Sequence, residues 1–444
     1  MEYSEDTTSG RVSAPEVVER PCGLYPALHT FSRDYGADDY RDWVEQSNGD
    51  PVPAPLVVYV QNEASSGPVS SGVSPAHLNE SRVIEHELRL QGGLFDADRP
   101  LRQLILAGSI ANQWSEDQLY RLVSTIQSSF FVNRDSFNSW CACVGDALPS
   151  LQRLRLLRAL GFNHIRYAPE ARPGKVNDFD RLSEAVQYAQ QLGFSKTIVD
   201  LRHLRKDRPD SAQAVEALLS GVQPDRIRVF LHEGEDRSAF DAHMTAFGYR
   251  NIGLDWYLRD ADSWWQSRAS DSLYWTLLGY SELKHPDVIG VGPGALSAVC
   301  EFYGINAASL PSYSACLDDG VLPVVQGTEL EDGDVLRREI IAMMLASFCV
   351  RVSAIEDKWG IRFEHFFARE TAVLDAFERN NWICRQDDKI EILSHGCREL
   401  AQICRVFDGW AGDRPGLLAA AAPDERSLQP GPSPVSVQNT PFHE

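Results

Sequence analysis

The stretch LVVYVQNEASSGPVSSGVS, residues Leu56–Ser74, decides how the rest of the chain is interpreted. Its first five residues form a short apolar run that is typical of a buried strand. The residues after this run are rich in Ser, Gly and Pro, and they include no Cys, no His and one acid, Glu63. In an α/β barrel, the loop after the first strand commonly carries chemistry. This loop therefore occupies a functional position but offers few groups with which to do chemistry.

Strand and helix patterns alternate from this run to about residue 260. Six further strands are predicted, at 101–107, 137–144, 164–167, 197–201, 226–231 and 251–256. Helical patterns lie between them, and one opens with a good N-cap at Ser115 while two others end at Gly161 and Gly193. Such a series predicts parallel strands covered by helices, either as a closed or partial barrel or as a doubly wound sheet. Short, evenly spaced strands favour the barrel, and no glycine-rich nucleotide motif follows the first strand.

The predicted organisation has five parts. Residues 1–20 and 411–444 are polar or rich in Pro, Gly, Ala and Ser, so both ends are predicted to be disordered. Residues 21–55 form an N-terminal lead-in, and residues 56–260 form the (β/α) barrel domain. Residues 261–410 are predicted to complete the barrel and to form a small α-rich C-terminal domain.

Composition excludes several classes of protein. The chain has 444 residues and a formal net charge of −21, which disfavours binding to nucleic acid or to anionic membranes. Nine Cys residues, an odd number, argue against a secreted disulfide framework. No apolar run approaches the roughly 20 residues that span a bilayer, and the acidic N-terminus is no secretory signal. We therefore expect a cytoplasmic protein.

Two groups of residues have a functional interpretation beside a structural one. Cys141 and Cys143 share a face if they lie on a strand, so the pair could hold a metal, although two small core residues are the favoured interpretation. An aromatic cluster favours core packing, with the wall of a flat apolar ligand site as the alternative. Its members are Trp264, Trp265, Tyr274, Trp275 and Tyr280.

Residues 21–410 resemble the oxygen-independent coproporphyrinogen III oxidases (coproporphyrinogen dehydrogenases), which are radical S-adenosylmethionine (SAM) enzymes of haem synthesis. The resemblance is spread over several segments: LVVYV, LGFNHIR from Leu160, LGFSKTIVDL from Leu192, NIGLDWYLR from Asn251 and GYSELKHPDVIGVGPGALS from Gly279. It implies a partial (β/α)₆ radical-SAM-type barrel with a small α-rich C-terminal domain. It also implies a 4Fe–4S cluster and SAM as the cofactors of the family.

The functional motifs depart from the family pattern. The three cluster cysteines of the family correspond to Ser65, Val69 and Gly72, none of which can bind iron as a thiolate does. The family segment HIPF before them is Gln61-Asn62-Glu63-Ala64, and the glycine-rich GGGTP is Ala107-Gly108-Ser109-Ile110-Ala111, whose added side chains should crowd SAM. A family glutamate corresponds to Cys143.

Three residues remain as candidates for the SAM shell by resemblance. Tyr59 and Asp200 match the family, and Glu170 takes the place of a glutamine. Arg166, Arg202 and Arg205 lie near strand ends and are candidates for binding an anionic ligand.

The leading hypothesis is a coproporphyrinogen III oxidase-like pseudoenzyme without catalytic residues, cluster or other metal. Whether the chain is an enzyme stays open at this point, since the alternatives are an active oxygen-independent coproporphyrinogen III dehydrogenase and a haem-binding or haem-trafficking protein. The expected partners are a tetrapyrrole or an active paralogue of this chain, and neither nucleic acid nor a membrane.

Overall fold

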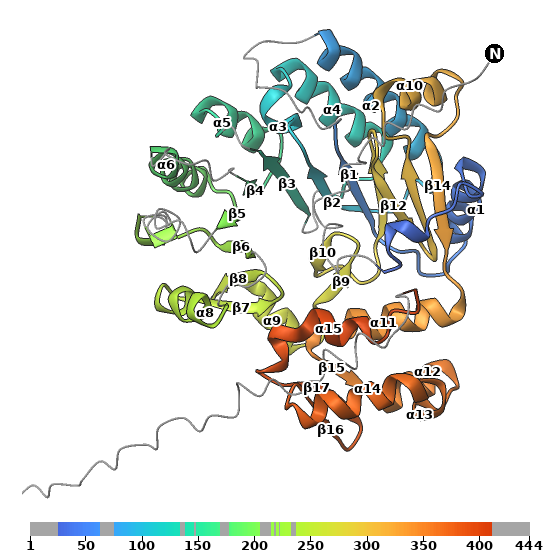
Figure 1. Cartoon of the computed structure of the whole chain (residues 1–444). Coiled ribbons are helices and arrows are strands. Elements are labelled where there is room, and N and C mark those ends of the chain that lie inside the picture. Colours follow the sequence, from blue (N-terminus) through green and yellow to red (C-terminus); the bar gives the residue numbers. More distant parts are fainter. Residues whose placement is uncertain are drawn as a thin grey trace, which may run out of the picture.

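A single large sheet, curled and covered by helices on its outer side, forms most of the molecule (Figure 1). The computed structural model describes residues 25–62, 75–133, 138–145, 148–168, 177–204, 215–216, 219–221, 223–231 and 237–410. The predicted disorder at 1–20 and 411–444 therefore lies outside the described residues. The order of the twelve strands is β14-β13-β12-β11-β1-β2-β3-β4-β5-β6-β8-β7.

The parallel part of the sheet runs from β1 to β6, and β11 is parallel to β1 on its other side. Its strands are β1 (Leu56–Val60), β2 (Leu101–Leu106), β3 (Ser139–Val144), β4 (His164–Tyr167), β5 (Lys196–Leu204), β6 (Arg226–Leu231) and β11 (Asp287–Val291). Seven neighbouring parallel strands confirm the predicted α/β class. The open strand order among the described residues fits a partial barrel and not a closed one.

Antiparallel strands extend both edges of the parallel part. On one side lie β12 (Leu296–Val299), β13 (Phe302–Asn306) and β14 (Val324–Glu329), and on the other lie β7 (Tyr249–Gly253) and β8 (Trp256–Arg259). A separate two-stranded ribbon, β9 (Tyr274–Thr276) and β10 (Gly279–Ser281), lies by the concave side of the sheet (Figure 1).

Helices cover the convex side, and most of them lie between the strands as the sequence predicts. They are α1 (Ala37–Asn48), α2 (Pro75–Gly92), α3 (Ile110–Gln113), α4 (Glu116–Ser129), α5 (Leu151–Ala159), α6 (Asn177–Gln191), α8 (Arg237–Ala246) and α10 (Leu310–Asp318). The sequence pattern does not predict α3 and α10. The predicted cap of α4 is present, because Ser115 Oγ accepts from Gln118 N at 3.2 Å and Gln118 Oε1 accepts from Ser115 N at 2.8 Å. This reciprocal pairing satisfies backbone donors that a helix start leaves open.

Strand β1 shows how each strand serves two faces. Leu56, Val58 and Val60 pack into the main core between the sheet and the outer helices. Val57 and Tyr59 point to the concave side and pack into a second, smaller apolar cluster. Because side chains alternate along a strand, the same five residues hold the fold on one side and line the barrel interior on the other.

One strand prediction is wrong. The segment 251–256, predicted as a single strand following the parallel series, is the turn of an antiparallel hairpin formed by β7 and β8. Gly253 and Leu254 have φ values of 135° and 49°, so the chain reverses there, and β8 returns antiparallel to β6. The periodicity of the apolar residues does not report this reversal.

The C-terminal domain has its own core. It contains α11 (Asp332–Ser347), β15 (Cys349–Arg351), α12 (Val352–Trp359), α13 (Phe363–Phe366), α14 (Ala368–Arg379), β16 (Ile383–Gln386), β17 (Lys389–Ile392) and α15 (Leu400–Arg405). Packed rings at its centre include Phe363, Phe367 and Phe407. This helix-rich domain also includes a three-stranded sheet of order β15-β17-β16.

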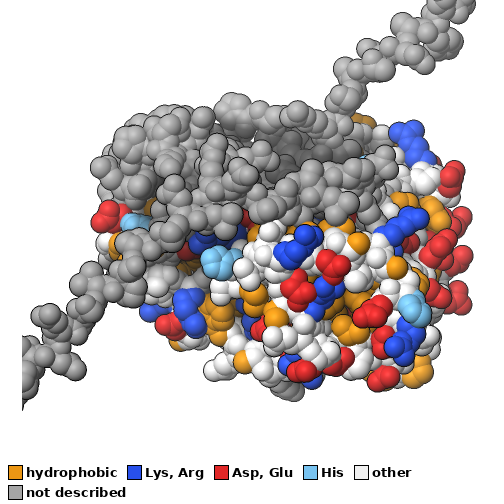
Figure 2. All heavy atoms as spheres, turned by 60° about the horizontal axis from the view of Figure 1, so that its bottom comes forward, with side chains coloured by type: hydrophobic (Ala, Val, Ile, Leu, Met, Phe, Trp, Pro, Cys, Tyr) orange, Lys and Arg blue, Asp and Glu red, His pale blue; other side chains and the backbone are white. Residues whose placement is uncertain are grey.

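The side of the molecule seen in Figure 2 carries acidic and basic side chains interspersed, without a continuous basic patch on its described residues. That distribution agrees with the acidic composition. None of the helices in the described part of the chain is long and apolar enough to cross a membrane.

Candidate functional site

The concave side of the sheet encloses a cavity of about 210 Å³. The strands contribute side chains in register: Cys141 of β3 lies beside His164 of β4, and Cys143 lies beside Arg166. Arg226 of β6 and Trp256 of β8 line it further along the sheet. Charged, thiol and aromatic groups thus face a common space, while the opposite faces of the same strands are apolar.

Asp200 of β5 is fully buried and is held by Arg166. The Arg166 guanidinium donates to Asp200 Oδ2 from Nη2 at 2.6 Å and from Nε at 3.0 Å. Asp200 Oδ1 has no hydrogen-bond partner within the described part of the chain. The side chain that the resemblance assigns to the SAM shell is therefore neutralised by a neighbouring strand of this chain.

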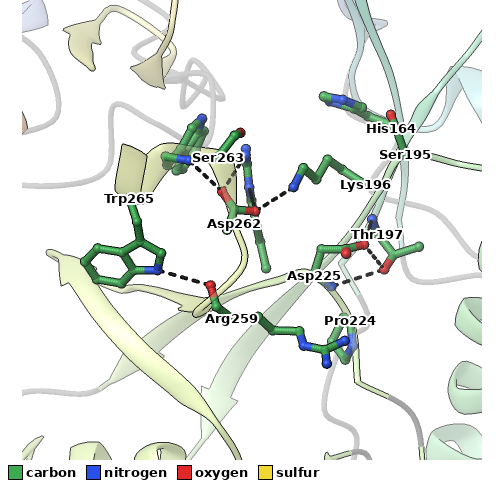
Figure 3. Close-up of polar contacts among 12 residues, drawn as sticks. His164, Ser195, Lys196, Thr197, Pro224, Asp225, Arg259, Asp262, Ser263 and Trp265 are labelled. Carbon is green, nitrogen blue, oxygen red and sulfur yellow. Dashed lines mark hydrogen bonds and ion pairs between the residues drawn. The ribbon is translucent and has the colours of Figure 1, made fainter. Parts of the chain in front are cut away.

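A second ion pair closes the start of β5 and β6. Arg226 binds Asp262 through two hydrogen bonds of 2.9 Å, and Lys196 Nζ donates to Asp262 Oδ2 at 2.8 Å (Figure 3). The backbone N–H of Trp264 donates to Asp262 Oδ1 at 3.0 Å, which caps the short helix α9 (Ser263–Ala269). Asp262 thereby ties α9 to two strands of the barrel.

The charges of this network set the ionisation of nearby groups. Burial alone would raise the pKa of Asp262, but the charge and hydrogen bonds of Arg226 and Lys196 hold it below its usual value. The pKa of His164 is lowered to about 3, mainly by burial and in part by repulsion from Arg226 and Lys196. His164 is therefore neutral near pH 7, with its Nδ1 2.9 Å from Ser139 Oγ.

Aromatic rings form part of the cavity wall. Trp256, Trp264 and Tyr280 pack together, and Trp264 and Tyr280 have ring centroids 5.5 Å apart. The Arg226 guanidinium lies 3.6 Å from the centroid of the Trp264 ring. Of the predicted aromatic cluster, Trp264 and Tyr280 are both core packing and cavity wall. Trp265 and Trp275 pack against them outside the cavity lining, and Tyr274 belongs to neither group.

Cys141 and Cys143 both point to the concave side. Cys141 is buried and Cys143 is half-buried, and the two lie two positions apart on the same face of β3. The hydrogen bond from Cys143 and the charge of Arg166 lower the pKa of the Cys141 thiol against the opposing effect of burial. The residues between and beside them, Ala142 and Val144, fill the outer core instead.

Asn62, just beyond β1, closes the turn after β2. Its Oδ1 accepts a hydrogen bond from the backbone N–H of Ser109 at 3.0 Å, and its Nδ2 donates to Ser109 Oγ at 2.8 Å. The Ser109 hydroxyl donates in turn to Gln113 Oε1 at 2.8 Å. Gly108 has a φ of 65°, and a Cβ there would lie 2.4 Å from Asn62 Oδ1, so the amide group of Asn62 lies directly against this turn.

The expected crowding of this turn has a different source from the one predicted. Ile110 and Ala111 do not reach the concave side, because both are fully buried in the outer core. Ala107 packs with Tyr59 in the inner apolar cluster. It is Asn62, from the preceding strand end, that covers the Gly108–Ser109 backbone.

The structure describes only some of the predicted site residues. Tyr59 is 8% exposed on the concave side, and Asp200 lies there as well. The remaining candidates, and the two arginines predicted beside Arg166, lie outside the residues whose side chains are described: Ser65, Val69, Gly72, Glu170, Arg202 and Arg205. Within the described ranges, no group of three or more His, Cys, Asp and Glu side chains is placed to hold a metal ion.

Comparison with known proteins points to one family. No family model matches the chain. Oxygen-independent coproporphyrinogen III oxidase of Salmonella typhimurium is 25% identical over 359 residues, covering 74% of this chain and 78% of that protein. The protein of that description from Synechocystis is 22% identical over 426 residues, covering 86% of this chain and 91% of the relative.

The solved structure of coproporphyrinogen III oxidase from Escherichia coli, described as a radical SAM enzyme, superposes with a TM-score of 0.78 at 22% identity, covering 87% of this chain and 96% of that one. The fold is therefore the α/β partial barrel of the radical SAM type. The resemblance found in the sequence is confirmed: over most of its length the chain is similar to the oxygen-independent coproporphyrinogen III oxidases.

Sequence reasoning missed the residues that arrange this site. Arg226 and Asp262 lie 36 positions apart, and Asn62 and Ser109 lie 47 apart, so no local pattern connects them. One signal was available. Arg226 is the first residue of the predicted strand 226–231, and alternation places its side chain on the same face as every second residue after it. A charged side chain that faces the interior of the barrel needs a partner of opposite charge.

Proposed function

We propose that this coproporphyrinogen III oxidase-like protein is a pseudoenzyme, which holds no 4Fe–4S cluster and performs no radical SAM chemistry. The observation that carries the proposal is the hydrogen bonding of Asn62 to the backbone and side chain of Ser109. In the family, the glycine-rich turn at this position leaves the backbone open to SAM. Here the Ser109 N–H is already satisfied, and a ligand would have to displace the Asn62 amide, leaving polar groups unpaired.

The composition of the loop supports the same conclusion independently. Residues 56–74 contain no Cys and no His, so the segment that carries the cluster ligands in the family has no thiolate to offer. A 4Fe–4S cluster needs such ligands. The ion pair between Arg166 and Asp200 is a third argument against SAM binding. The Asp200 carboxylate, which the resemblance assigns to the SAM shell, already binds Arg166.

Anaerobic reconstitution tests the proposal. The full chain is incubated with iron and sulfide, and bound iron, absorption and SAM binding are measured, with the Salmonella relative as the positive control. We expect iron at background level and no SAM binding in this chain. About four irons per chain together with cleavage of SAM under reducing conditions would restore the active-enzyme alternative.

A second candidate function is the binding of an anionic tetrapyrrole without turnover. Arg166 and Arg226 on the concave side suit carboxylate groups, which would have to compete with Asp200 and Asp262 for them, and the aromatic wall favours a flat ring. The described cavity of about 210 Å³ is smaller than the roughly 300 Å³ at which ligand pockets begin, so binding would require the surrounding loops to move apart. Titration with haem is the test: a sharpened Soret band that Arg166→Ala weakens supports it, and an unchanged spectrum at micromolar protein rejects it.

A further inference from the structure

The pair of cysteines on β3 differs from the other cysteines of the described chain. The strand alternation places Cys141 and Cys143 on the concave side, while Trp140, Ala142 and Val144 pack into the outer core. Neither cysteine belongs to an apolar cluster of the described residues. Cys141, 7% exposed, is buried as the favoured interpretation of the sequence expected, but the pair faces the cavity and not the outer core.

The geometry points to a binding site for a soft monovalent cation of the Cu(I) class, with the two thiolates of Cys141 and Cys143 as its ligands. The two cysteines are two positions apart on one strand and both line the same cavity, so rotation of the side chains can bring both thiols to one small ion. Both line the cavity of about 210 Å³, several times the roughly 30 Å³ share of one water molecule. The cavity thus offers both room for an ion and two sulfur ligands at the same place.

The number of donors selects the ion. Zn²⁺ in structural sites takes four protein ligands, and no group of three or more suitable side chains exists in the described ranges. Soft thiolates favour Cu(I), for which two sulfur ligands suffice. The imidazole of His164 lies beside Cys141, but its Nδ1 is engaged with Ser139 Oγ at 2.9 Å. A two-coordinate thiolate site is what remains.

The surrounding charge suits the complex that would form. Two thiols and one Cu(I) ion give a bis-thiolate complex with a net charge of −1, and two protons leave to solvent while copper keeps its oxidation state. Arg166 lies beside Cys143 in the strand register, and Arg226 lies further along the same cavity. Arg166 is paired with Asp200 and Arg226 with Asp262, so most of the positive charge at the cavity is balanced and an incoming cation is not strongly repelled.

One of the two proposed ligands is a departure from the family pattern. Cys143 stands where the family resemblance places a glutamate, so the pair arises at a position where the concave side has changed. The inference does not depend on the absence of the iron–sulfur cluster, because Cys141 and Cys143 lie on β3 and not in the loop after β1.

Competition for Cu(I) tests the site. The full-length reduced protein is titrated anaerobically with Cu(I) in the presence of bicinchoninate, whose coloured complex reports the copper that the protein has not bound. We expect the protein to withdraw one copper per chain, with two sulfur ligands in the X-ray absorption spectrum. Cys141→Ser/Cys143→Ser should abolish this competition, while the matched double variant Cys300→Ser/Cys397→Ser, which changes two half-buried cysteines outside the cavity, should retain it.

The single variant Cys143→Ser guards against misfolding of the double variant. Cys143 is only half-buried, and its loss leaves one of the two ligands, so copper affinity should fall by more than about 100-fold with an unchanged circular dichroism spectrum. Undiminished competition by either variant, or failure of the wild-type chain to compete, overturns the assignment.

Discussion

The two faces of the barrel strands have been shaped by different requirements. On the outer face, Val58, Leu104 and Ala142 are fully buried in one continuous apolar core. On the concave face, neighbouring positions carry thiols, arginines and carboxylates that differ from the family pattern at several places. Since side chains alternate along each strand, one face can change while the other keeps the fold. Divergence of function is then possible without divergence of architecture, and fold alone does not report chemistry.

The largest expected effect comes from breaking the ion pair on the concave side. Asp262→Ala leaves Arg226 buried without its counter-charge and removes the cap of α9, so the free energy of unfolding should fall by about 3–5 kcal/mol. Asp260, two residues away, pairs with Arg250 on the surface, and Asp260→Ala should cost less than about 1 kcal/mol. Urea denaturation of the two variants measures the difference. Equal losses of unfolding free energy in the two variants would show that burial does not strengthen the Arg226–Asp262 ion pair.

A neighbouring pair of residues on β2 compares the two faces directly. Leu104→Ala opens a hole in the outer core and should lower the free energy of unfolding by about 3 kcal/mol. Ile105→Ala on the concave side enlarges a cavity that already exists, so its cost should be nearer 1 kcal/mol. Thermal unfolding of both variants is the measurement. A larger loss for Ile105 would mean that the concave face, too, is close-packed in solution.

The outer face of the barrel strands could be predicted from the sequence better than the concave face. The apolar runs and caps predict the outer face and the helices, because both depend on local periodicity, as β1 and Ser115 show. The hairpin at Gly253 escapes prediction because positive φ values, not hydrophobicity, reverse the chain there. The hydrogen bonds of Asn62 to Ser109 and the pairing of Arg226 with Asp262 join distant segments. The sequence showed which residues differ from the family pattern. It could not show the new contacts that the side chains of this chain make, because these contacts join distant segments.

A buried acid on the outer side should make stability depend on pH. Burial raises the pKa of Glu87 to about 7, against hydrogen bonds from Tyr313, Gly292 N and Asn306 that lower it. Because the folded state holds this proton more tightly than the unfolded chain does, the free energy of unfolding should fall as pH rises from about 4.5 to about 7, and then level off. The contribution is up to about 3 kcal/mol. Glu87→Gln keeps the shape of the side chain and should remove this part of the pH dependence.

Chemical denaturation of the wild-type protein and of Glu87→Gln between pH 4.5 and 8 measures this pH dependence. The difference between their free energies of unfolding isolates the contribution of Glu87 from those of other groups. A constant difference across that range would contradict the assignment.

The smallest effect is expected where the two faces meet, at Asn62. Asn62→Ala removes two hydrogen bonds to Ser109 but exposes that turn to water, so the free energy of unfolding should fall by only about 1 kcal/mol. The local consequence should be larger than the global one: hydrogen exchange at the Ser109 amide should accelerate, while amides in β2 keep their protection. Mass spectrometry of the peptide covering 107–113 measures this. A loss of about 3 kcal/mol in the free energy of unfolding would instead show that the whole fold depends on Asn62. Faster exchange confined to this peptide would show that Asn62 covers the Gly108–Ser109 turn but that the fold does not require it.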